Sequence, residues 1–152
     1  IHEIITEVVE TLRPLVDEKN MQIIYNIPEN IEPMNIDSDK IKQVFINLIG
    51  NAIKFTPENT GIIEINVSPI ENKQLLFSVK DNGIGIHEKK LEKLFERFYQ
   101  VDNSSTRKYG GTGLGLSIVK KLIEIHKGKI WIESKISEGS TFFFTIPINS
   151  ED

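Results

Sequence analysis

The feature that most restricts the possible folds is the alternation along the chain of segments with a strand pattern and segments with a helix pattern. The predicted strands are 21–27, 62–68, 75–81, 129–134 and 141–147. The predicted helices are 3–19, 38–55, 87–95 and 113–127. Polar turns at 71–73 and 137–139 separate consecutive strands and predict hairpins. Hairpins mixed with helices in this order predict an α+β fold, in which helices pack on one face of one sheet.

Proline and glycine mark where the predicted helices bend or end. Pro14 lies inside the first helix, where we expect a kink or a break because proline lacks an N–H group. Pro57 ends the second helix near Phe55. Gly128 follows the last helix and is expected at C′, the position after a helix end that often takes a left-handed backbone.

Composition narrows the classes of function. The chain has 152 residues, which suits one domain over 1–152, and a start at Ile1 rather than Met suggests a fragment of a longer protein. The net charge of −4 lacks the basic footprint of a nucleic-acid-binding protein, so we expect no nucleic-acid partner. The absence of cysteine excludes disulfides and suits the reducing cytoplasm. No apolar run has membrane-spanning length, so we expect no membrane contact by this domain, although a longer parent could be anchored.

The helix at 38–55 carries a narrow polar stripe opposite a broad apolar face. The stripe consists of Lys40, Gln43, Asn47, Asn51 and Lys54. A solvated stripe is one interpretation. Asn is a poor helix former, however, and the last three of these residues stack about one turn apart, so they could converge on one ligand. An Asn amide oxygen suits Mg²⁺ that already carries phosphate oxygens, and a Lys one turn later supplies a positive charge for those phosphates.

Asp81 ends the strand predicted at 75–81 and lies on its apolar face, which is expected to point inward. A buried carboxylate is costly unless it is paired. Asp81 is either a turn former in its Asp-Asn-Gly sequence or the acceptor for the exocyclic amine of a ligand such as adenine. In the second case Gly83 and Gly85 would let the chain pass close to the purine.

The stretch KYGGTGLGLS, residues 108–117, combines many glycines with the start of a helix. It nearly matches two phosphate-binding signatures and is neither. Leu116 stands where a P-loop requires Lys, and the third glycine comes one residue early for a dinucleotide fingerprint. The free N–H groups and positive dipole end of the following helix favour an anion. A mobile surface loop is the alternative interpretation.

Four segments, in this order, resemble the sequence boxes of sensor histidine kinases. NLIGNAIKFT (47–56) resembles the N box, DNGIGI (81–86) the G1 box, FERF (95–98) the F box and GTGLGL (111–116) the G2 box. The resemblance covers essentially the whole chain and implies the ATP-binding catalytic domain of such a kinase. It also implies the two-layer α/β sandwich, or Bergerat-type fold, that DNA gyrase and a heat-shock chaperone share. That fold has a mixed sheet of about five strands with three main helices on one face.

The resemblance further implies roles for residues at the matching positions. Asn51 would coordinate Mg²⁺, with Asn47 nearby. Lys54 would meet phosphate, which makes Asn47 and Lys54 the catalytic candidates, and Phe55 would line the nucleotide site. Asp81 would bind the adenine amine directly and through water. The remaining purine and phosphate contacts would come from Gly83, Gly85, Ile86, Gly111, Thr112, Gly113, Leu114 and Gly115.

Residues 99–112 would form a lid over ATP, with the F box fixing its base. Arg97, Arg107 and Lys108 are candidates to touch the γ-phosphate, although solvated lid charges are the alternative. Gln100 departs from the pattern, because many family members have a basic residue there.

Asn47 bears on the reaction that the resemblance implies. ATPase relatives have a Glu at this position that activates water, whereas Asn cannot act as a general base. The kinases share the substitution, which implies slow hydrolysis and transfer of the γ-phosphate to a histidine, for relay to the receiver domain of a response regulator. His2 lacks the phosphoacceptor motif and His126 fits a structural helix end. The acceptor is therefore expected on a dimerisation domain outside this chain, in the same or the sister protomer.

Two rival functions are open. One is a module that binds ATP without transferring phosphate, against which the complete set of boxes argues. The other is an ATP-hydrolysing machine or a serine kinase of the same superfamily, against which Asn47 argues.

Overall fold

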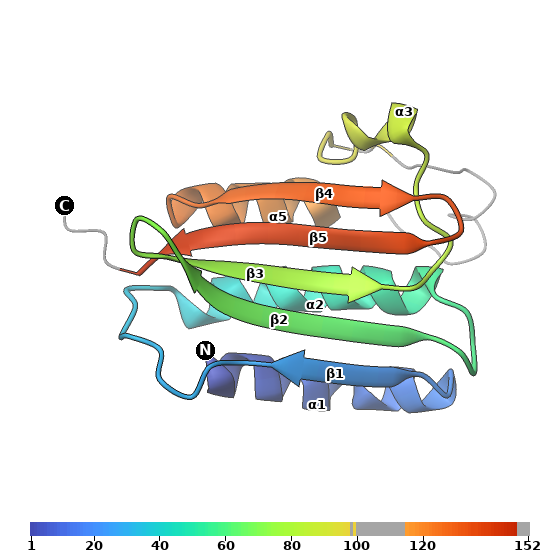
Figure 1. Cartoon of the computed structure of the whole chain (residues 1–152), viewed down its shortest axis with the longest axis horizontal. Coiled ribbons are helices and arrows are strands. Elements are labelled where there is room, and N and C mark those ends of the chain that lie inside the picture. Colours follow the sequence, from blue (N-terminus) through green and yellow to red (C-terminus); the bar gives the residue numbers. More distant parts are fainter. Residues whose placement is uncertain (98, 100–114, 149–152) are drawn as a thin grey trace.

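The computed structural model describes residues 1–97, 99 and 115–148, which form a five-stranded sheet covered by helices on one face (Figure 1). The strands are β1 (Gln22–Asn26), β2 (Ile62–Ile70), β3 (Gln74–Asp81), β4 (Lys129–Lys135) and β5 (Gly139–Pro147). The helices are α1 (His2–Glu18), α2 (Ser38–Phe55), the short α3 (Glu88–Leu91) and α5 (Gly115–Ile125). The two-layer α+β fold predicted from the sequence is confirmed.

The strand order in the sheet is β1-β2-β3-β5-β4. β1 and β2 run parallel and the other neighbours run antiparallel, so the sheet is mixed, as predicted. Both predicted hairpins form, and the first turns through the left-handed residues Asn72 and Lys73. Because β5 inserts beside β3, Ser140 lies directly opposite Asp81 in the register of the sheet.

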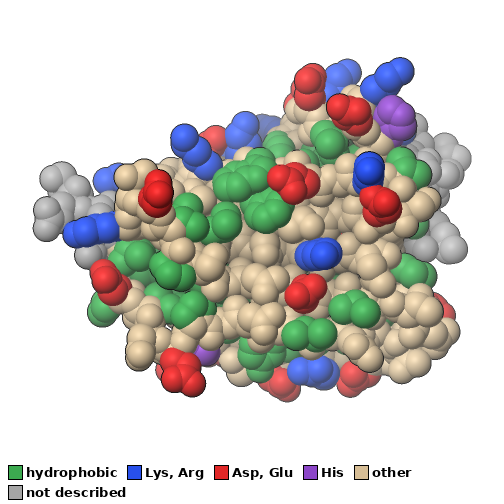
Figure 2. Space-filling view, viewed as in Figure 1, with side chains coloured by type: hydrophobic (Ala, Val, Ile, Leu, Met, Phe, Trp, Pro, Cys, Tyr) green, Lys and Arg blue, Asp and Glu red, His purple; other side chains and the backbone are tan. Residues whose placement is uncertain are grey.

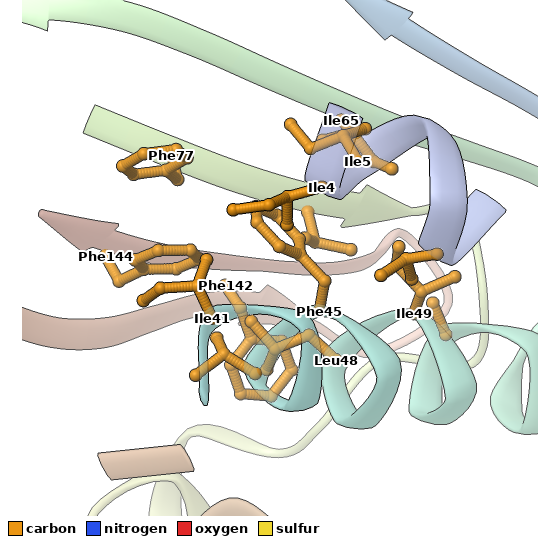
Figure 3. Packing of buried hydrophobic residues seen from close by; sticks show 14 of the residues in the cluster. Ile4, Ile5, Ile41, Phe45, Leu48, Ile49, Ile65, Phe77, Phe142 and Phe144 are labelled. Atoms are coloured by element: carbon orange, nitrogen blue, oxygen red, sulfur yellow. The ribbon is translucent and has the colours of Figure 1, made fainter. Parts of the chain in front are cut away.

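The core lies between the sheet and the apolar faces of α1, α2 and α5, with α2 in its centre. Phe45 of α2 is completely buried, and its ring centroid lies 6.0 Å from that of Phe77 and 5.5 Å from that of Phe144 (Figure 3). The rings of Phe77 and Phe144, on adjacent strands, stack at 4.6 Å. Burial of the apolar face of α2 leaves its polar stripe on the side away from the sheet.

The break considered at Pro14 does not occur, because α1 is one helix from His2 to Glu18. Pro14 is exposed, whereas Leu12 and Val16 on either side of it are buried in the core. The hydrogen bond that proline cannot make therefore lies on the solvent side, and the buried residues hold the helix to the core on both sides of Pro14.

The left-handed residue after α5 is Lys127, with φ 60°, rather than Gly128. Gly128 N–H donates to the Ile123 carbonyl at 3.0 Å and Lys127 N–H to the Glu124 carbonyl at 2.9 Å, which is the Schellman pattern with Lys127 at C′. Gly128 is needed for another reason: a Cβ there would lie 1.9 Å from the Thr145 carbonyl oxygen of β5.

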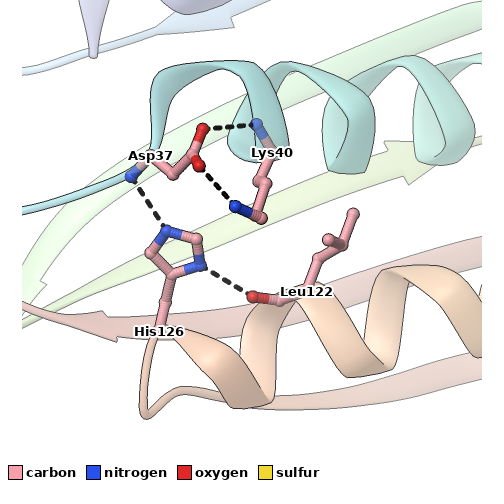
Figure 4. Close-up of polar contacts among 4 residues, drawn as sticks. All are labelled: Asp37, Lys40, Leu122 and His126. Carbon is pink, nitrogen blue, oxygen red and sulfur yellow. Dashed lines mark hydrogen bonds and ion pairs between the residues drawn. The ribbon is translucent and has the colours of Figure 1, made fainter.

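His126 ties the end of α5 to the start of α2 (Figure 4). Its Nδ1 bonds to the Leu122 carbonyl at 2.7 Å, and its Nε2 accepts a hydrogen bond from the Asp37 N–H at 3.0 Å. Asp37 in turn caps α2, because its Oδ1 accepts from the Lys40 N–H. His126 is thus the structural helix-end residue that was expected.

Figure 2 shows the face of the sheet that the helices leave open, where hydrophobic side chains occur in separate groups among charged ones. One pair there is Trp131 and Phe143, stacked at 5.5 Å on neighbouring strands. Within the described residues, no helix combines the length and apolar character needed to cross a membrane.

Candidate functional site

The predicted N-box and G1-box residues meet at one end of the sheet, where α2 and β3 end and β5 begins (Figure 1). The carbonyl of Phe55, the last residue of α2, accepts a hydrogen bond from the Ile84 N–H at 3.2 Å. Gly83 packs against the same carbonyl, since a Cβ there would lie 2.3 Å from the Phe55 oxygen. Segments about thirty residues apart in sequence therefore share one site.

Asp81 is buried at this end, with 7% of its surface exposed, on the same inward face as the apolar residues of β3. Its Oδ1 accepts hydrogen bonds from the N–H groups of Gly83 at 2.8 Å and Ser140 at 3.3 Å. The two interpretations of Asp81 are therefore compatible, because one oxygen shapes the turn and the side chain still points inward.

The second oxygen of Asp81 is available to a ligand. All hydrogen bonds of this side chain within the described ranges go to Oδ1. No side-chain polar atom of those residues is both buried and unpartnered, so Oδ2 reaches solvent. Burial raises the pKa of Asp81 above the ordinary 3.8, and the N–H groups of Gly83 and Ser140 oppose that rise. A hydrogen-bond donor on a ligand would offset the free-energy cost of removing the carboxylate from water.

Glycine is required in the loop after β3 by close backbone contacts. Gly85 has a φ of 72°, and a Cβ there would lie 1.9 Å from the Lys135 carbonyl oxygen. Gly139, with a φ of 98°, approaches the Asp81 carbonyl equally closely, and its Cβ would lie 2.0 Å from that oxygen. The loop that carries the G1 box after β3, residues 82–86 (the G1 loop), and the β4–β5 turn therefore hold each other in place.

Serines of β4 and β5 that the sequence analysis missed complete this contact. The Ser134 hydroxyl accepts a hydrogen bond from the Ile86 N–H at 2.8 Å and lies 2.7 Å from the Ser140 hydroxyl. The Ser137 N–H donates to the Ile84 carbonyl at 2.8 Å. Their only sequence signal was the predicted turn at 137–139, and nothing local indicated that this turn faces the G1 loop.

The polar stripe of α2 lies at the surface, as predicted. Asn47 and Asn51 are half-buried and Lys54 is exposed. The Asn47 Nδ2 donates to the Gln43 carbonyl at 2.9 Å, which aims the amide oxygen away from its own helix. That oxygen lies beside Gly115 at the start of α5, where a Cβ would come within 3.0 Å of it. The last glycine of the G2 box, Gly115, thus meets the N box.

Four G2-box residues predicted to contact the nucleotide lie outside the described residues: Gly111, Thr112, Gly113 and Leu114. Most of the predicted lid also lies outside them, including the γ-phosphate candidates Arg107 and Lys108 and the departure at Gln100. Arg97 is described and exposed. The geometry of the candidate site therefore rests on α2, the G1 loop, the β4–β5 turn and the first turn of α5.

Residues 36–150 match the model of the family described as "Histidine kinase-, DNA gyrase B-, and HSP90-like ATPase". The sensor histidine kinase WalK of Bacillus subtilis (strain 168) is 46% identical over 135 residues, which are 88% of this chain and 22% of WalK. The chain thus spans less than a quarter of that relative.

Solved structures show the same fold. The catalytic domain of histidine kinase ThkA, in a nucleotide-free form, superposes with a TM-score of 0.82 and 36% identity over 97% of this chain and 92% of that domain. ThkA has also been solved in complex with the response regulator protein TrrA (TM-score 0.80, 34% identity, 98% of this chain and 40% of that one). Full-length ShkA in complex with AMPPNP gives a TM-score of 0.85 and 28% identity, over 98% of this chain and 30% of ShkA.

Proposed function

Because this chain belongs to the family of histidine kinase-, DNA gyrase B- and HSP90-like ATPases, we propose that it is the Mg²⁺·ATP-binding catalytic domain of a sensor histidine kinase. In this proposal it presents the γ-phosphate of ATP to a histidine on a separate dimerisation domain. Phosphate then passes to the receiver domain of a response regulator, a partner class supported by the ThkA–TrrA complex. A cytoplasmic location fits, since ATP is supplied there.

The observation that carries the proposal is the buried carboxylate of Asp81 with one oxygen still open. A purine lying against Gly83 and Gly85 would bring an exocyclic amine to that oxygen. Adenine has a donor at this position and guanine has an acceptor, so the carboxylate selects adenine. Both glycines keep this loop in close contact with its neighbours, because a Cβ at Gly83 or Gly85 would overlap the carbonyl oxygen of Phe55 or of Lys135.

The phosphates are assigned to the stripe of α2 and the start of α5. Asn47 and Asn51 present amide groups one turn apart, and Lys54 follows at the exposed end of the helix. Within the described ranges, no three His, Cys, Asp or Glu side chains are grouped to hold a metal. The proposal therefore gives Mg²⁺ one protein ligand, the Asn51 amide oxygen, beside phosphate oxygens, which suits the preference of this ion. Mg²⁺ would supply charge neutralisation of the transferring phosphate.

Asn47 supports transfer to a histidine rather than to water. An amide cannot remove a proton from water, so no general base is offered at this position of α2. An imidazole needs no general base to become a nucleophile, because its neutral nitrogen already carries a lone pair. That nitrogen attacks the γ-phosphorus while the bond from the γ-phosphorus to the ADP oxygen breaks. The chain then contributes positioning and charge neutralisation, which dominate phosphoryl transfer.

The test is phosphoryl transfer in trans. This chain with Mg²⁺·[γ-³²P]ATP should release phosphate slowly and should not label itself. Addition of a helical dimerisation domain from a sensor histidine kinase should give acid-labile, alkali-stable label on that domain. The same acceptor with its histidine changed to Gln is the control. Rapid hydrolysis without acceptor, or acid-stable label on serine, would contradict the proposal; binding without any transfer would reduce the chain to an ATP-binding module.

Asn51→Ala tests the metal assignment. We expect the Kd for ATP in the presence of Mg²⁺ to rise at least about tenfold, because the ion loses its protein ligand. In EDTA the variant and the wild type should bind ATP with similar Kd. Isothermal titration calorimetry in both buffers measures the four values, and Asn30→Ala in an exposed loop provides the control. An equal loss of affinity with and without Mg²⁺ would show that Asn51 does not act through the metal.

A further inference from the structure

Lys19 lies at the end of α1, before the residues that match the family model, and its ammonium group reaches the last turn of α2. Nζ donates to the carbonyl of Ile53 at 2.5 Å and to the carbonyl of Thr56 at 2.7 Å. These two carbonyls bracket Lys54 and Phe55, the residues assigned to phosphate and to the nucleotide site.

The sequence of α2 explains why a donor is needed there. In a continuing helix the Ile53 carbonyl would accept the N–H group four residues later. That residue is Pro57, which has no N–H group, so the carbonyl is left without its helical partner. The Lys19 ammonium replaces the missing donor and places a positive charge at the negative end of the helix dipole.

Lys19 is itself held in place by its surroundings. Its backbone is the C-cap of α1, and the left-handed Asn20 that follows closes the helix end, with the Met21 N–H bonding to the Val16 carbonyl at 3.0 Å. The Lys19 carbonyl accepts from the Asn59 N–H at 2.9 Å, in the loop between α2 and β2. The end of α1 and the loop after α2 therefore form one bonded unit.

From this unit, contacts lead to the adenine end of the site. Phe55 lies between the two carbonyls that Lys19 holds, and its own carbonyl accepts from the Ile84 N–H of the G1 loop. Gly83 packs on that carbonyl and donates its N–H to the Asp81 carboxylate. A shift of the last turn of α2 would thus move the loop that orients Asp81.

We propose that Lys19 is a positioning residue of the nucleotide site, which sets the end of α2 against the G1 loop and thereby adjusts the selection of adenine. The inference rests on the proposed function, since it concerns the site assigned to ATP. In this proposal Lys19 acts on the site through the carbonyls of Ile53 and Thr56, and not by contact with the nucleotide.

The test compares Lys19→Met with Lys42→Met. Lys42 also ties α1 to α2, through an ion pair with Glu7 at 2.5 Å, but it lies near the start of α2, far from the G1 loop. For each variant we would measure the Kd for ATP and for inosine triphosphate, whose base carries a carbonyl in place of the amine, at a temperature below both midpoints of unfolding. Lys19→Met should lose affinity for ATP by about 2- to 30-fold and lose less for inosine triphosphate, so that its ATP preference falls.

Lys19→Arg retains a charged donor with several N–H groups and should restore the preference for ATP. Lys42→Met should keep the wild-type ratio of the Kd for inosine triphosphate to the Kd for ATP. A merely structural Lys19 would lower the melting temperature of Lys19→Met and leave the ratio unchanged, which would overturn the proposal. The proposal would also be overturned if this ratio fell equally in Lys42→Met. If Lys19→Met does not fold, Lys19→Leu, which also lacks a donor, replaces it, and a wild-type ratio in that variant would refute the proposal. Failure of the wild-type chain to bind ATP would instead contradict the proposed function.

Discussion

Replacement of Asp81 by Asn is expected to remove most of the affinity for ATP and to reverse the base preference of the site. Oδ1 already accepts the Gly83 and Ser140 N–H groups, so the Asn amide nitrogen takes the place of the open Oδ2. A donor then faces the donor amine of adenine. A hydrogen bond to a charged group is worth about 1.5–3 kcal/mol, so the Kd for ATP should rise about 10- to 150-fold. Inosine triphosphate presents an acceptor at this position, so the affinity of the variant for it should fall much less.

Calorimetric titration of both nucleotides checks this result. Asp17→Asn makes the same chemical change at an exposed position of α1 and should leave both Kd values unchanged. An Asp81→Asn variant that binds ATP like the wild type would refute the adenine assignment, whatever its stability.

The same variant should not lose stability at neutral pH. Burial raises the pKa of Asp81 in the folded chain above 3.8, its value when unfolded. The folded state therefore favours the protonated side chain. That stabilising effect is complete below pH 3.8 and is lost as the pH rises through the raised pKa. Asn does not titrate and has no such loss. The free energy of unfolding of the variant, relative to that of the wild type, should therefore rise across this pH window, and the difference should be constant above it. Urea unfolding without nucleotide at a series of pH values measures the difference.

Gly85→Ala is expected to damage both the fold and the site. The φ of 72° places the residue in the left-handed region, which costs Ala about 1–2 kcal/mol relative to the right-handed one. Its Cβ would also lie 1.9 Å from the Lys135 carbonyl oxygen, so the G1 loop or the β4–β5 turn must move. We expect the free energy of unfolding to fall by more than about 1 kcal/mol and the affinity for ATP to fall with it.

Gly50→Ala is the matched control for this prediction. Gly50 is within α2, and nothing lies within 4 Å of a Cβ built there. This substitution should stabilise the chain by about 0.5–1 kcal/mol, because Ala is the better helix former. Urea unfolding and ATP titration of both variants measure the two effects, and wild-type stability in Gly85→Ala would disprove the close contact with Lys135.

Much of the fold could be predicted because its signals are local. The apolar face of α2, the two hairpins and the inward side of Asp81 each follow from the spacing of residues within one segment. The predictions that failed concern positions where packing overrides a local preference. Pro14 does not break α1, because residues on both sides of it are packed in the core. Lys127 rather than Gly128 takes the left-handed position, and Gly128 instead passes close to β5.

The sequence by itself determined the order of the strands and the long helices and where the turns fall, and it is the source of the prediction that Asn51, Lys54 and Asp81 bind a ligand. Only the tertiary structure decided that Ser134 of β4 accepts a hydrogen bond from the G1 loop and that Lys19 donates to a free carbonyl at the end of α2. The physical reason is the range of the forces involved. Periodicity and turn chemistry act over a few residues, whereas these contacts join residues more than thirty positions apart and depend on strand order and helix packing.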